Sequence, residues 1–207
     1  PLTRLETPPT FRGFDRGVRG AGTRNYVVIM GTTSRTAAFA RIVAQRLESL
    51  PKVGGFDGVV AVAHTEGGST EAPNNKDLLL RTLAGFAVHP NVGALMCVDY
   101  GSEAVSNAAL QQYLRDEDYA IDAVPHRFLS LAGGFDMHLA EAEAQARSWA
   151  EQLQQQSRVE LPVSHLKLAL QCGGSDAFSG VSGNPLAAWA ARELIRSGGA
   201  ANLAETD

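Results

Sequence analysis

The stretch NYVVIM, residues 25–30, followed after a short polar turn by TAAFARIVAQRLESL, residues 36–50, decides the fold class. The first run is short, continuous and apolar, which is typical of a strand covered on both faces. The second run has the length and apolar spacing of an amphipathic helix. Together they predict one strand followed by one helix.

The same pattern recurs along the rest of the chain. The further expected strands are residues 56–64, 92–100, 126–131, 166–171 and 200–205, and the helices between them are 75–89, 102–114, 137–153 and 184–198. Because parallel strands need crossovers of this length, we predict an α/β fold: a doubly wound, Rossmann-like, mostly parallel sheet of about five or six strands with helices on both faces. We assign it to residues 26–207, and residues 1–25 to an extended N-terminal arm or entry loop.

Composition limits the possible partners. The 207 residues are 44% hydrophobic, enough for a full core, and carry a net charge of -4 with 18 scattered basic residues. This balance argues against a nucleic-acid surface or a membrane patch, and no apolar run reaches the roughly 18 residues that span a bilayer. We therefore expect a small-molecule partner and a cytoplasmic location.

Cys97 lies inside an apolar run, and so we predict that it is an unreactive thiol in the core.

Both ends suggest a fragment, because the chain starts at a proline and stops just after an apolar segment. We expect the N- and C-terminal parts of the same protein to be missing from it. A piece separated from those parts should leave an apolar patch or its arm unpaired, and so a homodimer is expected.

Glycine and polar residues follow five of the expected strands. They are found at 31–36, 64–69, 99–103, 132–134 and 172–176. Each loop taken alone is also explained as a tight turn or a helix cap. Since the carboxyl ends of parallel strands meet at one edge of a sheet, the recurrence favours a shared ligand-binding cleft there.

Four separated motifs resemble the altronate dehydratase and galactarate dehydratase family of sugar-acid hydro-lyases. They are GTRNYVVIM (22–30), FDGVVAVAHTEGG (56–68), LLLRTLAGFAVHPNVGALM (78–96) and ALQCGGSDAFSGVSGNPLAAWAARELIRSGGAANLAET (169–206). The resemblance implies dehydration of a sugar acid, an aldonate or aldarate, to a 2-keto-3-deoxy acid. It also implies a divalent metal, iron in the family.

Dehydration beside a carboxylate requires a base, a cation to hold the enediolate charge and an acid to protonate the departing hydroxyl. We expect His64, Glu66 and Asp176 to act as acid–base groups; the alternative for His64 is a structural histidine at a strand end. The expected metal ligands are Cys172 and His64. The expected substrate-binding residues are Arg24, Asn25, Arg35, Thr65, Gly173, Gly174 and Ser175.

The chain departs from the family at three cysteine positions. Family members usually have cysteines where this sequence has Arg35, Gly68 and Ser102, so that only Cys172 remains. One thiolate and one imidazole cannot rebuild a soft-ligand site, which argues against the family metal in this chain.

Two hypotheses about the function follow. One is a divergent hydro-lyase that uses Arg35 or a harder metal, with a lyase that expels a group other than water as a minor variant. The other is a non-catalytic sugar-acid-binding paralogue or subunit.

Overall fold

Two compact units make up the chain in the computed structural model, which describes residues 2–171, 173–174 and 176–204. One unit comprises residues 14–158. The other combines residues 1–13 with residues 159–207. Among the described helices, none is both long enough and apolar enough to span a membrane.

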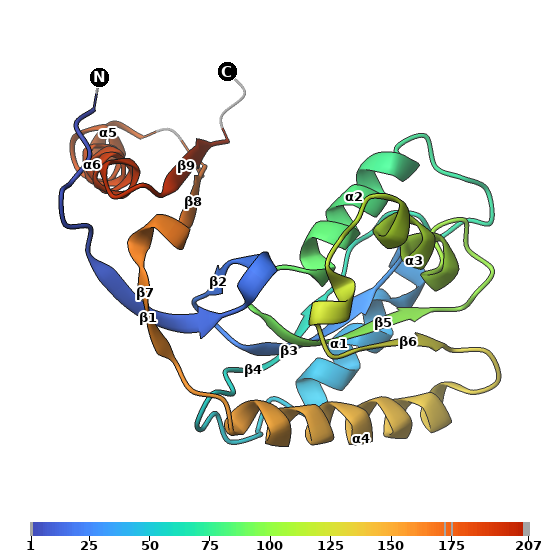
Figure 1. Ribbon diagram of the computed structural model, residues 1–207. Helices are drawn as coiled ribbons and strands as arrows, with labels where there is room; N and C mark the ends of the chain where they lie inside the picture. Colours follow the sequence, from blue (N-terminus) through green and yellow to red (C-terminus); the bar gives the residue numbers. More distant parts are fainter. Residues whose placement is uncertain (1, 172, 175, 205–207) are drawn as a thin grey trace. The chain divides into compact units, whose positions relative to one another are not determined.

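A four-stranded parallel sheet forms the centre of the 14–158 unit (Figure 1). Its strands, in spatial order, are β4 (Gly58–Val62), β3 (Tyr26–Gly31), β5 (Val92–Asp99) and β6 (His126–Ser130). The order changes direction between β3 and β5: the chain first adds β4 on one side of β3, then places β5 and β6 on the other. In open α/β sheets, ligands bind at such a reversal.

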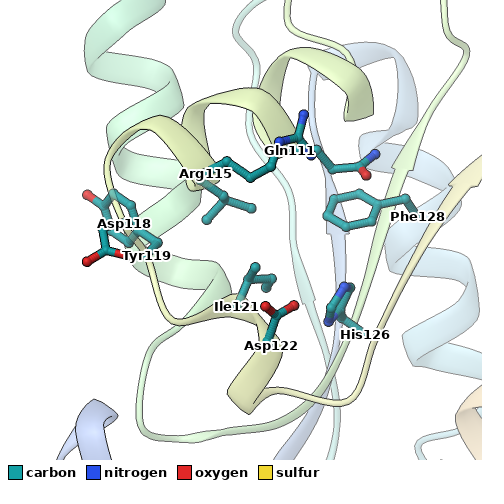
Figure 2. A pocket seen from close by; sticks show the side chains of 9 residues that line it. Gln111, Arg115, Asp118, Tyr119, Ile121, Asp122, His126 and Phe128 are labelled. Carbon is teal, nitrogen blue, oxygen red and sulfur yellow. The ribbon is translucent and has the colours of Figure 1, made fainter.

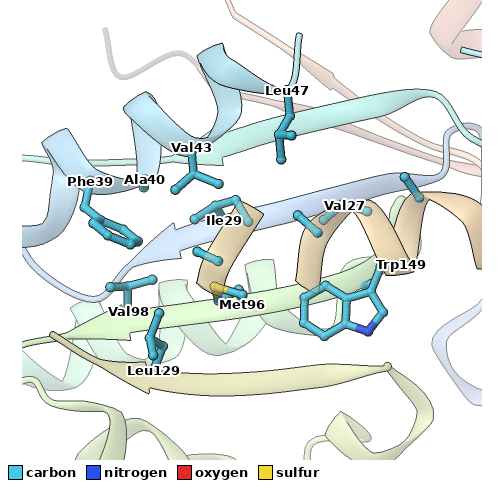
Figure 3. Close-up of a cluster of buried hydrophobic side chains, with 14 of the residues drawn as sticks. Val27, Ile29, Phe39, Ala40, Val43, Leu47, Met96, Val98, Leu129 and Trp149 are labelled. Atoms are coloured by element: carbon cyan, nitrogen blue, oxygen red, sulfur yellow. The ribbon is translucent and has the colours of Figure 1, made fainter. Parts of the chain in front are cut away.

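Helices cover both faces of this sheet, as the continuous apolar strands predict. On one face lie α1 (Ala37–Arg46) and α4 (Phe135–Gln154), and on the other lie α2 (Lys76–Ala87) and α3 (Asn107–Asp116). Alternate residues of each strand serve the two cores: Ile29 packs under α1 and α4, whereas Met30 packs under α2 and α3. Figure 3 shows the first core, with Phe39 and Trp149 against the strands.

The sheet has fewer strands than the predicted five or six. The apolar run at 166–171 does form a strand, β8 (Lys167–Leu170), but it pairs in parallel with β9 (Ala200–Leu203) in the other unit. A strand that the sequence does not predict, β7 (Val159–Pro162), pairs antiparallel with Thr10–Gly13 of β1 (Thr10–Asp15). Apolar patterning predicts a strand and does not specify its partner, which is why the sequence reading joined β8 to the central sheet.

Between β8 and β9 lie α5 (Ala177–Val181) and α6 (Gly183–Arg196). These helices expose large apolar side chains, namely Phe178, Val181, Leu186 and Trp189. The predicted N-terminal arm, residues 1–25, contains β1 and a short strand β2 (Ala21–Gly22), which pairs with Phe14 and Asp15 of β1.

Candidate functional site

Three loops meet at the carboxyl edge of the central sheet. Ser34, which follows β3, donates its N–H to the carbonyl oxygen of Glu66, which follows β4, at 2.8 Å. Ala104, which follows β5, donates its N–H to the carbonyl oxygen of Ser69 at 3.2 Å. A side chain at Gly68 would place its Cβ 2.4 Å from Ser34 Oγ, so glycine allows this close approach. The predicted convergence therefore holds for the loops after β3, β4 and β5.

Arg35 is held at the meeting point of these loops. Its Nη1 donates to Ser102 Oγ at 2.9 Å, and its guanidinium carbon lies 4.8 Å from the centre of the Tyr100 ring. The Arg35 Cγ lies 3.3 Å from the position of a Cβ at Gly68. Positions 35, 68 and 102, where the resemblance implies cysteines in the family, are thus close together, and the Arg35 side chain lies against the other two. An exposed, oriented guanidinium is suited to bidentate binding of a carboxylate.

Two buried carboxylates lie behind the Tyr100–Glu103 loop. Glu103 accepts hydrogen bonds from the N–H groups of Tyr100 and Ser102, each at 3.1 Å. Asp99 accepts from the N–H of Asn107 at 2.7 Å and so ties the end of β5 to the start of α3. Burial raises the pKa of Asp99, and the nearby charge of Glu103 adds to the rise. The sequence reading gave neither carboxylate a role, because no local pattern shows that such a charge is buried.

His64 lies half-buried at the start of the loop after β4. Its Nδ1 accepts the N–H of Glu66 at 3.2 Å. In a neutral imidazole this places the proton on Nε2, since one ring nitrogen accepts and the other donates. Nε2 is buried and has no hydrogen-bond partner within the described segments. In this tautomer His64 is a donor through Nε2 and offers no lone pair there to a metal.

The remaining predicted residues divide between the units. Thr65 and Glu66 are exposed in the loop beside His64. Gly173, Gly174 and Asp176 are exposed in the other unit, where the Asp176 carboxylate accepts the N–H of Ser179 at 2.8 Å and caps α5, the alternative role foreseen for such loops. The predictions for Cys172 and Ser175 fall outside the described residues.

Arg24 and Asn25 lie at the opposite, amino edge of the sheet, because they precede β3 instead of following it. Asn25 is fully buried and donates from Nδ2 to the carbonyl oxygen of Gly55 and to Gln156 Oε1. Arg24 lies 4.0 Å from the carboxylate of Asp57. The structure therefore does not bring these two predicted substrate-binding residues together with Arg35 and His64.

The donors at the carboxyl edge do not fit the metal that the family resemblance implies. Arg35, Gly68 and Ser102 supply a guanidinium, a hydrogen atom and a hydroxyl, none of which is a soft ligand. Within residues 2–171, 173–174 and 176–204, no three or more His, Cys, Asp or Glu side chains are grouped to hold a metal ion.

A separate pocket of about 360 Å³ lies between α3 and the edge strand β6 (Figure 2). Arg115 from α3 and His126 from β6 line it together with Asp118, Asp122 and Phe128. Its acidic and basic side chains largely offset one another, and none of the predicted site residues lines it. The carboxyl edge therefore remains the candidate site.

The fold and this edge define an α/β protein with a candidate anion-binding site built around an arginine and a histidine. The profile described as D-galactarate dehydratase/Altronate hydrolase, second domain, matches residues 13–154. A second profile, D-galactarate/Altronate dehydratase, C-terminal, matches residues 163–207. The chain belongs to this galactarate and altronate dehydratase family.

Individual relatives agree with this assignment. Altronate dehydratase from Bacillus subtilis is 30% identical over 200 residues, which is 95% of this chain and 38% of the relative. Galactarate dehydratase (L-threo-forming) from Escherichia coli is 30% identical over 134 residues, 61% of this chain and 25% of the relative. The (2R)-sulfolactate sulfo-lyase subunit beta from Chromohalobacter salexigens is 26% identical over 189 residues, 91% of this chain and 44% of the relative. The chain thus spans less than half the length of each of these proteins.

Proposed function

We propose that this chain supplies the carboxylate-binding part of a hydro-lyase that dehydrates a sugar acid such as altronate or galactarate to a 2-keto-3-deoxy acid. The observation that carries the proposal is the Arg35 guanidinium, held by Ser102 and Tyr100 where the loops after three parallel strands meet. The order of the central sheet supports it, because a Rossmann-like, doubly wound sheet binds its ligand where the strand order reverses. Family membership and the names of the relatives supply the substrate class.

In this proposal Arg35 binds the substrate carboxylate with the donors that Ser102 does not use. The same cation stabilises negative charge that develops when the neighbouring carbon loses its proton. His64 holds the loop that carries Glu66, because its Nδ1 accepts the N–H of Glu66 at 3.2 Å. Glu66, exposed beside His64, is the candidate general base, and the carboxylic acid formed when it takes the proton returns that proton to the departing hydroxyl, which leaves as water.

Calorimetric titration of the full-length protein with galactarate, altronate and (2R)-sulfolactate tests the proposal, with and without EDTA. Arg35→Ala should weaken acid binding by about 1.5–3 kcal/mol, the usual worth of a hydrogen bond to a charged group. Arg41→Ala is the matched control, because Arg41 is exposed on α1 away from these loops. The proposal is wrong if Arg35→Ala behaves like Arg41→Ala, and its metal-free binding mode is wrong if EDTA abolishes binding.

A second candidate function is a non-catalytic sugar-acid-binding subunit. The observation that favours it is the presence of Arg35, Gly68 and Ser102 at positions where the resemblance implies cysteines in the family. Both candidates predict acid binding that depends on Arg35, and turnover separates them. A coupled assay for the 2-keto-3-deoxy product should detect turnover for the hydro-lyase and none for the binding subunit.

A further inference from the structure

Glu103 is almost completely buried, 4% exposed, and within the described part of the chain the hydrogen-bond partners of its carboxylate belong to the loops after β3 and β5 that hold Arg35. The N–H of Tyr100 is shared by both oxygens, at 3.1 and 3.2 Å, and Oε2 also accepts from the N–H of Ser102 at 3.1 Å. Thr33, two residues before Arg35, directs its hydroxyl at the same carboxylate at 3.4 Å. Glu103 therefore links the loop after β3 to the loop after β5.

The two residues that hold the Arg35 side chain, Ser102 and Tyr100, both donate a backbone N–H to the Glu103 carboxylate. Ser102 supplies the hydroxyl that accepts from Arg35 Nη1, and Tyr100 supplies the ring beside the guanidinium. Because Glu103 bonds the N–H of each of these residues, it fixes the acceptor and the ring in one arrangement. An arginine held in one orientation loses less side-chain entropy when it binds an anion.

We propose that Glu103 is a positioning residue that preorients Arg35 for a carboxylate ligand, an inference that rests on the proposed function. Glu103 acts through Arg35 because its own oxygens are buried and already accept hydrogen bonds. The Glu103 charge affects ligand binding in two ways, by repelling the anion and by positioning Arg35, and these two effects change the affinity in opposite directions. The negative charge by itself repels a bound anion, so neutralising it would strengthen binding. Weaker binding after neutralisation therefore has the opposite sign to this direct charge effect, as lost positioning predicts.

Glu103→Gln tests this in the full-length protein, with galactarate and altronate as probes in calorimetric titrations. Glutamine keeps the size of the side chain but directs an NH2 group at one of the two N–H donors, which frees part of the loop. We expect binding about tenfold weaker, the scale set by ordering one flexible side chain. Glu117→Gln, an exposed glutamate just after α3, is the control and should bind like the parent protein.

A double-variant comparison distinguishes positioning from general damage. If Glu103 acts through Arg35, then Glu103→Gln should weaken binding no further in a protein that already carries Arg35→Ala. Unchanged or tighter binding by Glu103→Gln overturns the proposal. So does an additional tenfold loss in the Arg35→Ala background. If Glu103→Gln does not fold, Ser102→Ala takes its place, because it removes the hydroxyl through which Glu103 acts. Ser102→Ala should then bind the acids about tenfold more weakly, and should cause no further loss in the Arg35→Ala background. Unchanged or tighter binding by Ser102→Ala overturns the proposal.

A measurement without ligand separates this inference from the proposed function. Solvent exchange of the Arg35 side-chain N–H groups can be followed by NMR with isotope-labelled arginine, the signal being assigned by its loss in Arg35→Ala. Exchange should become faster in Glu103→Gln and stay unchanged in Glu117→Gln. Faster exchange in a protein that binds none of the acids supports positioning while the proposed function fails. Unchanged exchange overturns positioning whether or not an acid binds.

Discussion

Replacing Asn25 with alanine should destabilise the 14–158 unit and leave sugar-acid binding intact. The side chain is fully buried and makes three hydrogen bonds: Nδ2 donates to the carbonyl oxygen of Gly55 at 2.7 Å and to Gln156 Oε1 at 3.0 Å, and Oδ1 accepts from Arg16 Nη2. Two neutral bonds contribute about 1 kcal/mol each and the bond from the charged arginine about 1.5–3 kcal/mol. Arg16 keeps its bonds to Pro90 and Gln156, so we expect a loss at the lower end of that sum, about 3.5 kcal/mol in the free energy of unfolding.

Urea denaturation followed by tryptophan fluorescence measures this loss. The chain has two tryptophans: Trp149 is buried in the 14–158 unit, and Trp189 is 56% exposed in the other. In a Trp189→Phe background the signal therefore reports on the unit that contains Asn25. The midpoint should fall while the slope stays constant, as expected when stability alone changes.

Asn74→Ala is the matched control, because Asn74 is exposed in the loop before α2 and should change stability by less than about 0.5 kcal/mol. The reasoning is refuted if Asn25→Ala loses less than about 1 kcal/mol while acid binding weakens. That result would return Asn25 to the substrate-binding role that the sequence predicts for it.

Two further predictions concern titratable side chains. The carbonyl oxygen of Ala132 and the carboxylate of Glu141 both accept hydrogen bonds from His138, and they raise its pKa. A pKa raised by folding stabilises the protein below the unfolded value of about 6.5. This stabilisation should disappear as the pH rises through the folded pKa. His138→Gln should therefore reduce unfolding free energy more at pH 6 than at pH 9 in urea titrations, and an equal reduction at both would contradict this. Burial raises the pKa of the Cys97 thiol, so iodoacetamide should modify the Cys97 peptide, identified by mass spectrometry, only after urea is added. Modification of the native chain at Cys97 would show that this strand opens.

The alternation of strands and helices, the parallel sheet and the location of a polar edge could all be predicted from the sequence. Each depends on local patterns: apolar runs such as 25–30, helical spacing such as 36–50, and glycine with polar residues after each strand. Strand polarity places Arg35 and His64 at the same edge once the strands are parallel. The same rule assigns Arg24 and Asn25 to the opposite edge, because they precede their strand.

The tertiary structure alone decided which strands pair and which charges are buried. An apolar run such as 166–171 has the same pattern whether it joins the central sheet or pairs with β9, since pairing depends on segments distant in sequence. Glu103 and Asp99 lie in an ordinary-looking DYGSE run, yet the packing of the β3 and β5 loops excludes water from both. Burial is a property of contacts between remote segments, so the carboxylate that holds the Arg35 loops became visible only in three dimensions.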